Sequence, residues 1–247
     1  MKITWITPAG AAPALCLSIL DQPHILIAGA TGSGKSVIIN STIYTALYKA
    51  PTQCKLVLID PKRVELVKYR NLPHTIAYAS EPIQIIQTIQ KSVELMESRY
   101  KAMQRRGEVK SCEAAVYIVI DEFADLMTTS KRETLPNLCR ISQLGRAANV
   151  HLIIATQRPT RDIINGQIKV NLDSRLALRC PTPQDSRNII DRKGAETLPR
   201  YGYGYYYTPD GLELVKIPMI DPRELQVRVN HWEQQNRLTR WLWKTSL

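Results

Sequence analysis

The stretch His24-Ile-Leu-Ile-Ala-Gly29-Ala-Thr-Gly-Ser-Gly34-Lys35-Ser36-Val37 decides how the rest of this chain folds. It begins with a short apolar run that predicts a strand over 24–28, and it continues into an apolar-periodic segment that predicts a helix. Between the two, residues 29–36 match the pattern G-x-x-x-x-G-K-[ST] in full, which is typical of a loop that binds nucleotide phosphates. A glycine turn that only joined a strand to a helix would not require Lys35.

The residue types in this phosphate loop (29–36) predict what each of them does. Gly29, Gly32 and Gly34 allow backbone conformations that a Cβ atom would forbid, so successive N–H groups can point at phosphate oxygens near the positive end of the helix dipole. We expect Lys35 to reach the β- and γ-phosphate oxygens and the Ser36 hydroxyl to ligate Mg²⁺. The residues predicted to hold the nucleotide are Gly29, Ala30, Thr31, Gly32, Ser33, Gly34, Lys35, Ser36 and Val37.

A second apolar run, Val116-Tyr-Ile-Val-Ile, ends in the adjacent carboxylates Asp121 and Glu122. Ligands of open α/β sheets bind beyond the carboxyl ends of the strands, so this pair is predicted to lie beside the Mg²⁺-nucleotide. Asp121 would then belong to the Mg²⁺ shell, and Glu122 would polarise the attacking water. Without the phosphate loop, an apolar run followed by Asp-Glu would often be no more than a strand cap.

A further buried strand is predicted over His151-Leu-Ile-Ile-Ala155, and Thr156-Gln157-Arg158-Pro159 follows it. A polar side chain at this strand end would lie near the γ-phosphate and report on hydrolysis, and Gln157 is the best candidate for that sensor. The alternative is an amide that caps the loop.

The remaining pattern predicts an α/β fold with a mostly parallel central sheet, flanked by helices and closed at its edge by an antiparallel hairpin over 201–217. Strands are expected at 55–59 and 75–79, and Pro82 is expected to open the longest helix. The charged side chains of that helix, Arg99 among them, are expected to face solvent. We expect a single domain over 1–247, with an N-terminal hairpin at 1–22, a core at 23–220, and a C-terminal helix and tail at 221–247.

The composition favours a polyanionic partner, because 33 Lys and Arg against 22 Asp and Glu give a net charge of +11. Basic side chains are dense over 158–193, and no aromatic stacking platform accompanies them, so duplex nucleic acid is favoured over single strands. The five cysteines and four histidines are scattered, which argues against disulfides and a structural metal. No secretory signal and no run of 18 apolar residues occurs, so a soluble, cytoplasmic protein is expected.

Several motifs together resemble the motor domain of the FtsK/SpoIIIE DNA translocases. The resemblance extends from about residue 14 to about 235, and the motifs that carry it are Pro23-His-Ile-Leu-Ile-Ala-Gly29, Leu58-Ile-Asp-Pro-Lys62, Asp121-Glu-Phe-Ala-Asp-Leu126, His151-Leu-Ile-Ile-Ala-Thr-Gln-Arg-Pro159 and Asp185-Ser-Arg187. It implies a RecA-like P-loop ATPase core that uses ATP and Mg²⁺, assembles as a homo-oligomeric, hexameric ring, and pumps double-stranded DNA through a central pore.

The resemblance also implies roles for individual residues. Lys35, Ser36, Asp121 and Glu122 match the phosphate, Mg²⁺ and water-activating positions, and Gln157 matches the sensor. Arg146 matches the arginine that the family inserts into the neighbouring subunit's site, although a cation at a helix C-terminus would also explain it. The residues that match DNA contacts facing the pore are Arg158, Lys169 and Arg187.

The sequence also departs from such translocases. We expect no membrane region and no winged-helix module like those of relatives that segregate chromosomes, and we expect an accessory DNA-loading or membrane partner to supply those functions. A motor domain without these modules suits DNA segregation, conjugative transfer or DNA packaging, with ATP as the only small-molecule substrate. The alternative is a protein-secretion ATPase of the type VII kind, which shares the same core. A third reading, an inert scaffold with a relic nucleotide site, is disfavoured because every catalytic position is intact.

Overall fold

The computed structural model describes the backbone of residues 14–164 and 166–245, and side chains as far as residue 234. Its centre is an eight-stranded sheet with the order β3-β2-β4-β5-β1-β6-β7-β8. The first six strands in that order pair in parallel, and β7 and β8 pair antiparallel at one edge, which confirms the predicted fold class. The strands are β1 (His24–Ala28), β2 (Cys54–Ile59), β3 (Thr75–Ala79), β4 (Ala115–Ile120), β5 (Val150–Thr156), β6 (Ser174–Ala177), β7 (Tyr203–Thr208) and β8 (Gly211–Lys216).

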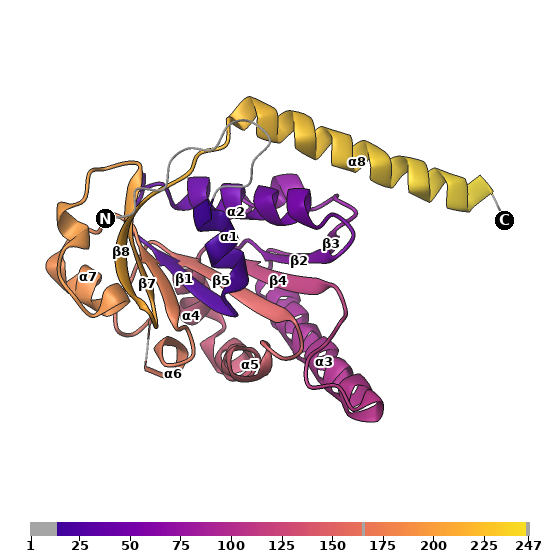
Figure 1. Cartoon of the computed structure of the whole chain (residues 1–247), viewed down its shortest axis with the longest axis horizontal. Helices are drawn as coiled ribbons and strands as arrows, with labels where there is room; N and C mark the ends of the chain where they lie inside the picture. The colour runs from indigo at the N-terminus through magenta and orange to yellow at the C-terminus, as the bar shows by residue number, and fades with distance from the viewer. Residues whose placement is uncertain (1–13, 165, 246–247) are drawn as a thin grey trace.

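Helices cover both faces of this sheet (Figure 1). Alternate strand residues therefore enter two cores. In β1, Leu26 packs with the core under α3, α4 and α5, whereas Ile25 and Ile27 pack with the core under α1, α2 and α8. The helices are α1 (Ala14–Asp21), α2 (Lys35–Lys49), η1 (Val67–Tyr69), α3 (Pro82–Arg106), α4 (Phe123–Thr129), α5 (Lys131–Leu144), α6 (Gly166–Lys169), α7 (Pro183–Ile190), η2 (Ala195–Thr197) and α8 (Pro222–Thr245).

The segment before β1 is a helix, so the second half of the predicted N-terminal hairpin is wrong. Residues 14–21 form α1, which packs against α2. The apolar run is too short for its period to separate a strand from a helix, and the buried side chains Leu15, Cys16 and Ile19 have helical spacing. The first half of the predicted hairpin, around residues 3–6, lies outside the described residues.

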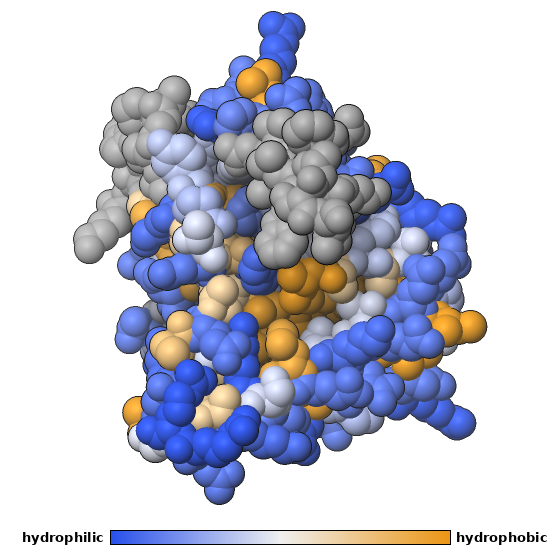
Figure 2. Space-filling view, turned by 90° about the vertical axis from the view of Figure 1, so that its right-hand side faces the viewer, coloured by the Kyte–Doolittle hydropathy of each residue, from blue (hydrophilic) through white to orange (hydrophobic). Residues whose placement is uncertain are grey.

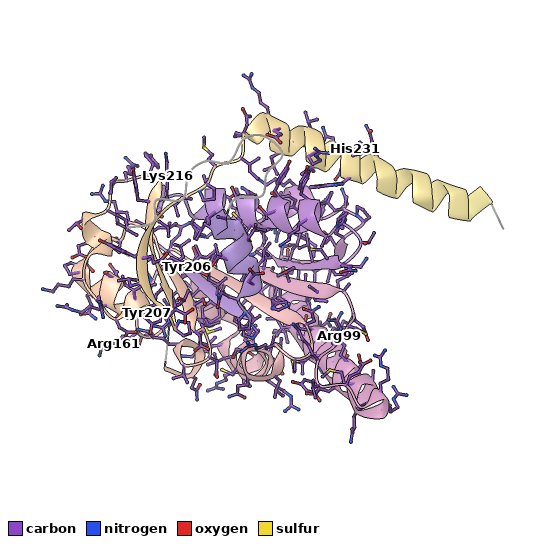
Figure 3. All side chains as sticks on the ribbon, viewed as in Figure 1. Arg99, Arg161, Tyr206, Tyr207, Lys216 and His231 are labelled. Carbon is purple, nitrogen blue, oxygen red and sulfur yellow. The ribbon has the colours of Figure 1, made fainter. Side chains whose placement is uncertain are left out.

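The solvent-facing position expected for Arg99 is also wrong, because its side chain is only 5% exposed. Its guanidinium donates to the carbonyl oxygens of Ala148 (2.8 Å), Asn149 (3.0 Å) and Ala114 (2.7 Å), and its Nε lies 3.3 Å from the Glu113 carboxylate. Arg99 therefore joins the loop before β4 to the turn before β5. Figure 3 shows it on the opposite side of the molecule from Arg161.

The surface of the molecule is largely hydrophilic, but apolar residues gather at the centre of the face seen in Figure 2. A hollow of about 320 Å³ is lined by residues at the amino ends of β2 and β4, by the end of α2 and by α1.

None of the helices in the described part of the chain combines the length and the apolar content needed to cross a membrane.

The structure predicts that His24 makes the fold sensitive to acid. Its ring is buried, and Nδ1 accepts a hydrogen bond from the Leu152 N–H at 3.0 Å. Burial, with a smaller effect of His151, lowers the pKa of His24 to about 3. The unfolded chain therefore takes up this proton below about pH 6.5 and the folded chain does not, so His24 alone should lower the free energy of unfolding by about 2 kcal/mol between pH 7.5 and pH 5.

Urea unfolding at the two pH values tests this prediction. The His24→Gln variant, whose amide oxygen can still accept from Leu152, should lose about 2 kcal/mol less on acidification than the unmodified chain. The exposed His231→Gln is the control and should behave like the unmodified chain. An equal pH effect in all three proteins would contradict the assignment.

Candidate active site

The phosphate loop connects the end of β1 to the start of α2 and has the conformation that its glycines predict. Gly32 (φ 72°) and Gly34 (φ 103°) lie in the left-handed region. Gly29 is required for a different reason, since a Cβ atom there would lie 2.7 Å from both Leu178 Cβ and Ser33 Oγ. The end of β6 therefore packs directly against the loop.

Two features of the loop fit phosphate oxygens. Because α2 begins at Lys35, the N–H groups of its first turn have no acceptor within the helix. In addition, Ser33 Oγ is buried and has no hydrogen-bond partner among the described residues. Such a group is costly unless a ligand satisfies it. The Ala30 N–H donates to the Arg179 carbonyl at 2.8 Å, which fixes the loop beside the end of β6.

Lys35 and Asp121 form a buried ion pair at the centre of the site. The Lys35 ammonium is 3.1 Å from Asp121 Oδ1 and donates to the Asp121 carbonyl at 2.9 Å. Burial raises the pKa of the Asp121 carboxyl above its ordinary value, although Lys35 acts in the opposite direction. The predicted phosphate-binding lysine and metal-shell carboxylate are therefore within hydrogen-bonding distance.

Glu122 lies beside them and is held on several sides. Its carboxylate accepts from Thr156 Oγ1 (2.8 Å) and the Gln157 N–H (3.1 Å), and the Lys62 ammonium is 3.2 Å away. Burial acts to raise the pKa of Glu122, but these hydrogen bonds and the two nearby lysines outweigh it, so that pKa lies below its ordinary value. Glu122 is thus an oriented, ionised carboxylate.

Gln157 is also brought to the phosphate loop, because β5 and β1 are neighbours in the sheet. Its Oε1 accepts from Thr31 Oγ1 at 2.7 Å. This contact links the end of β5 to the loop, as a residue that reports on the γ-phosphate would require.

The sequence interpretation missed three residues of this site. Thr156 and Lys62 hold Glu122, and Glu65 accepts from Ser36 Oγ at 2.7 Å. Lys62 and Glu65 lie just beyond the carboxyl end of β2, and Thr156 is the last residue of β5. The sequence could have indicated them, because each lies at or just after the carboxyl end of a strand, and the carboxyl ends of the parallel strands lie beside the phosphate loop.

The donor set fits Mg²⁺ carried by a nucleotide. Mg²⁺ takes oxygen ligands and usually binds through one or two carboxylates together with substrate phosphates. Ser36 and Asp121 supply such oxygens, and Asp60 Oδ1 is buried with no hydrogen-bond partner among the described residues. In the same part of the chain no group of three or more His, Cys, Asp or Glu is arranged to hold a metal ion.

Arg146 is not in this site. It is exposed in the turn between α5 and β5, at the amino end of β5, whereas the site lies at the carboxyl end. The seven residues of β5 separate the two ends by roughly 20 Å. Arg146 therefore does not reach the phosphate loop of its own chain.

The three predicted DNA contacts lie on segments that follow β5 and β6. Arg158 and Arg187 are exposed, and Arg187 lines a hollow of about 450 Å³ together with Arg161 and Lys169. Lys169 is engaged within the chain, because its ammonium donates to Asp191 Oδ1 at 2.7 Å. Arg175 lies 2.7 Å from the other oxygen of Asp191, so this carboxylate joins two cations.

Comparison with known families identifies the chain. A model of the FtsK/SpoIIIE family matches residues 13–115 and 107–161, which is more than half of the sequence. The chain belongs to the FtsK/SpoIIIE family. It is 43% identical over 204 residues to the DNA translocase FtsK of Helicobacter pylori (strain J99 / ATCC 700824), a match that covers 76% of this chain and 24% of that protein. This FtsK/SpoIIIE chain thus spans about a quarter of the length of such curated relatives.

Solved structures agree with the fold of this FtsK/SpoIIIE chain. The pCW3 conjugation coupling protein TcpA, a monomer form with ATPγS, superimposes with a TM-score of 0.76 at 23% identity, covering 86% of this chain and 65% of TcpA. The cytoplasmic domain of the Thermomonospora curvata type VII secretion ATPase EccC gives a TM-score of 0.72 at 24% identity, covering 85% of this chain and 28% of that chain. One of these proteins is named for conjugation coupling and the other for type VII secretion, so the fold does not distinguish the two functions that the sequence left open.

Proposed function

We propose that this chain is the motor domain of an ATP-driven translocase of double-stranded DNA. The observation that carries the proposal is the meeting of Lys35, Ser36, Asp121, Glu122 and Gln157 at one edge of the sheet, in a chain of the FtsK/SpoIIIE family. Phosphoryl transfer depends on positioning and charge stabilisation, and this arrangement supplies both.

Each side chain has a role in ATP hydrolysis under this proposal. The phosphate loop and Lys35 bind the triphosphate, and Ser36 and Asp121 would hold Mg²⁺, which would supply positive charge beside the phosphate oxygens. Glu122, ionised and fixed by Thr156 and the Gln157 N–H, accepts a hydrogen bond from the attacking water and takes up its proton. The Gln157 amide, bonded to Thr31, senses the γ-phosphate.

The position of Arg146 favours an assembly of several copies. Because Arg146 lies at the amino end of β5, away from the site at the carboxyl end, it can act on a phosphoryl group only in another subunit. A guanidinium supplied across an interface couples hydrolysis to assembly, and a closed ring gives every site such an arginine. We therefore include a homo-oligomeric ring, most simply a hexamer, in the proposal.

Mixing two inactive variants tests the action of Arg146 across the interface. Arg146→Ala lacks the arginine but retains an intact site, and Glu122→Gln lacks the catalytic carboxylate but retains the arginine. Each protein should hydrolyse ATP at least about tenfold more slowly than the unmodified chain, and a mixture should regain activity because some sites combine both intact parts. Hydrolysis in the mixture no faster than the mean of the two separate variants would contradict the arrangement.

The basic surface beyond β5 and β6 is the proposed DNA interface. Arg158 and Arg187 are exposed there, and the chain as a whole carries a charge of +11. Lys169 joins them under this proposal by exchanging the Asp191 carboxylate for a DNA phosphate. Contacts of this kind bind the duplex backbone without reading its sequence.

A mobility-shift assay with duplex DNA measures this interface. Arg158→Ala/Arg187→Ala should weaken binding and reduce the slope of log affinity against log salt by roughly 1.8, since each phosphate contact contributes about 0.9. The matched control is Lys101→Ala/Arg105→Ala, which removes two exposed cations near the end of α3 and should leave the slope unchanged. An equal effect of both pairs would contradict a localised interface.

The second candidate is a protein-secretion ATPase, because the type VII secretion ATPase EccC has the same fold. Such a motor should bind a polypeptide and be indifferent to duplex DNA. In the same mobility-shift assay, an unmodified chain that binds no duplex at low salt would favour the secretion function.

A further inference from the structure

Ser36, the expected hydroxyl ligand of Mg²⁺, is oriented by a carboxylate from outside the two motifs that define the site. Ser36 Oγ donates a hydrogen bond to Glu65 Oε1 at 2.7 Å, whereas Asp121 is engaged with Lys35. A hydroxyl has one proton and two lone pairs. With the proton directed at Glu65, the lone pairs of Ser36 Oγ point elsewhere and are free to bind a cation.

The backbone between β2 and η1 is built to place Glu65 there. Asp60 at the end of β2 is fully buried, and its Oδ2 accepts from the Leu66 N–H at 3.0 Å. The Arg63 N–H donates to the Asp60 carbonyl, and Arg63 itself has a φ of 58°, so the chain turns back sharply after the strand. Leu66 is buried beside Glu65 and anchors the turn in the core under α2.

The local charges favour a cation at this position. Asp60, Glu65 and Asp121 lie close enough to interact electrostatically, and the buried cation that pairs with Asp121 is Lys35. With Glu122 and Lys62, which lie beside them, four carboxylates share this site with two ammonium groups. A divalent cation bound with a nucleotide would offset this excess of negative charge.

We propose that Glu65 is a positioning residue of the magnesium site, which holds the Ser36 hydroxyl in the orientation that binds Mg²⁺. The inference rests on the proposed function, because it concerns the metal that accompanies ATP. Glu65 acts through Ser36, in the manner of carboxylates that orient the ligands of metal sites, whose loss typically costs 10-fold to 100-fold in metal affinity. The other reading is that Glu65 only fixes the turn 61–66 to α2.

The test is a titration of Mg²⁺ into the full chain with a fluorescent ATP analogue, followed by the same binding measurement in EDTA. Glu65→Gln keeps the size of the side chain but replaces the charged acceptor with an amide, which bonds the Ser36 hydroxyl more weakly and can also donate to its lone pairs. It should raise the Mg²⁺ concentration for half-maximal binding about tenfold and leave the nucleotide affinity in EDTA unchanged or higher. Glu65→Asp, which restores the charge, should recover part of the Mg²⁺ affinity.

Glu81→Gln is the matched control, because Glu81 pairs with Arg63 of the same turn but lies outside the site. It should leave the Mg²⁺ titration unchanged. The role of Glu65 would be overturned if Glu65→Gln showed the same Mg²⁺ dependence as the unmodified chain. It would also be overturned if this variant lost nucleotide affinity equally with Mg²⁺ and in EDTA, because that result would indicate a purely structural contact. An unmodified chain that binds no nucleotide, or that binds it without regard to Mg²⁺, would instead overturn the proposed function and this inference together.

Discussion

Glu122→Gln is expected to bind ATP as tightly as the unmodified chain and to hydrolyse it roughly 10²-fold to 10⁴-fold more slowly. The substitution preserves the size of the side chain, and an amide oxygen can still accept from Thr156 and from the Gln157 N–H. The amide cannot take a proton from water, so only the chemical step is lost. Equilibrium binding of a fluorescent ATP analogue and single-turnover hydrolysis measure the two effects separately.

Asp125→Asn provides the control for this prediction. Asp125 is also a carboxylate of the segment after β4, and its Oδ2 is 4.0 Å from the same Lys62 ammonium, but 37% of its side chain is exposed. Its hydrolysis rate should stay within about twofold of the unmodified rate, since an exposed ion pair contributes little. If Glu122→Gln hydrolysed ATP as fast as Asp125→Asn, Glu122 would not be the catalytic carboxylate.

Lys35→Ala is expected to weaken ATP binding by roughly 10²-fold to 10⁴-fold, because two contacts to charged phosphates would each be worth about 1.5–3 kcal/mol. The same change leaves the buried Asp121 carboxylate without its ammonium. Since burial already raises the pKa of Asp121, the carboxyl can take up a proton, and the domain should remain folded at a reduced free energy of unfolding.

The double variant Lys35→Ala/Asp121→Asn separates these two effects. It removes the unpaired carboxylate, so part of the lost unfolding free energy should return, whereas ATP binding should stay weak. The exposed Lys49→Ala, at the other end of α2, should change neither quantity. Recovery of ATP binding in the double variant would show that Lys35 acts by neutralising Asp121 and not by contacting phosphate.

Much of the site was predictable because parallel strands present their carboxyl ends at one edge of a sheet. The pattern over 24–37 predicts β1, the loop and α2, and the apolar runs before Asp121 and Gln157 predict two more parallel strands. These apolar runs do not predict the order of the strands in the sheet. In any order, however, the carboxyl ends of parallel strands lie on the same side of the sheet. The structure then brings Gln157 to Thr31 and Asp121 to Lys35.

The residues that sequence reasoning misplaced depend on tertiary contacts. Arg99 has the position in the sequence pattern of a solvent-facing helix residue. Its guanidinium is nevertheless buried, because it donates hydrogen bonds to three backbone carbonyls from two turns far away in the chain. Glu65 lies in a polar turn without periodicity, and only the left-handed Arg63 and the buried Asp60 bring it to Ser36. Local propensity contains no information on such contacts, because they form between segments far apart in the chain.

The central claim is that ATP hydrolysis at this site is coupled to double-stranded DNA. The most direct measurement is the rate of ATP hydrolysis with and without closed circular duplex DNA at increasing salt, for the unmodified chain and for Arg158→Ala/Arg187→Ala. We predict that the duplex stimulates hydrolysis at low salt, that salt abolishes the stimulation, and that the double variant keeps the basal rate but loses most of the stimulation. Absence of hydrolysis by the unmodified chain, or an equal rate with and without the duplex at low salt, would contradict the account.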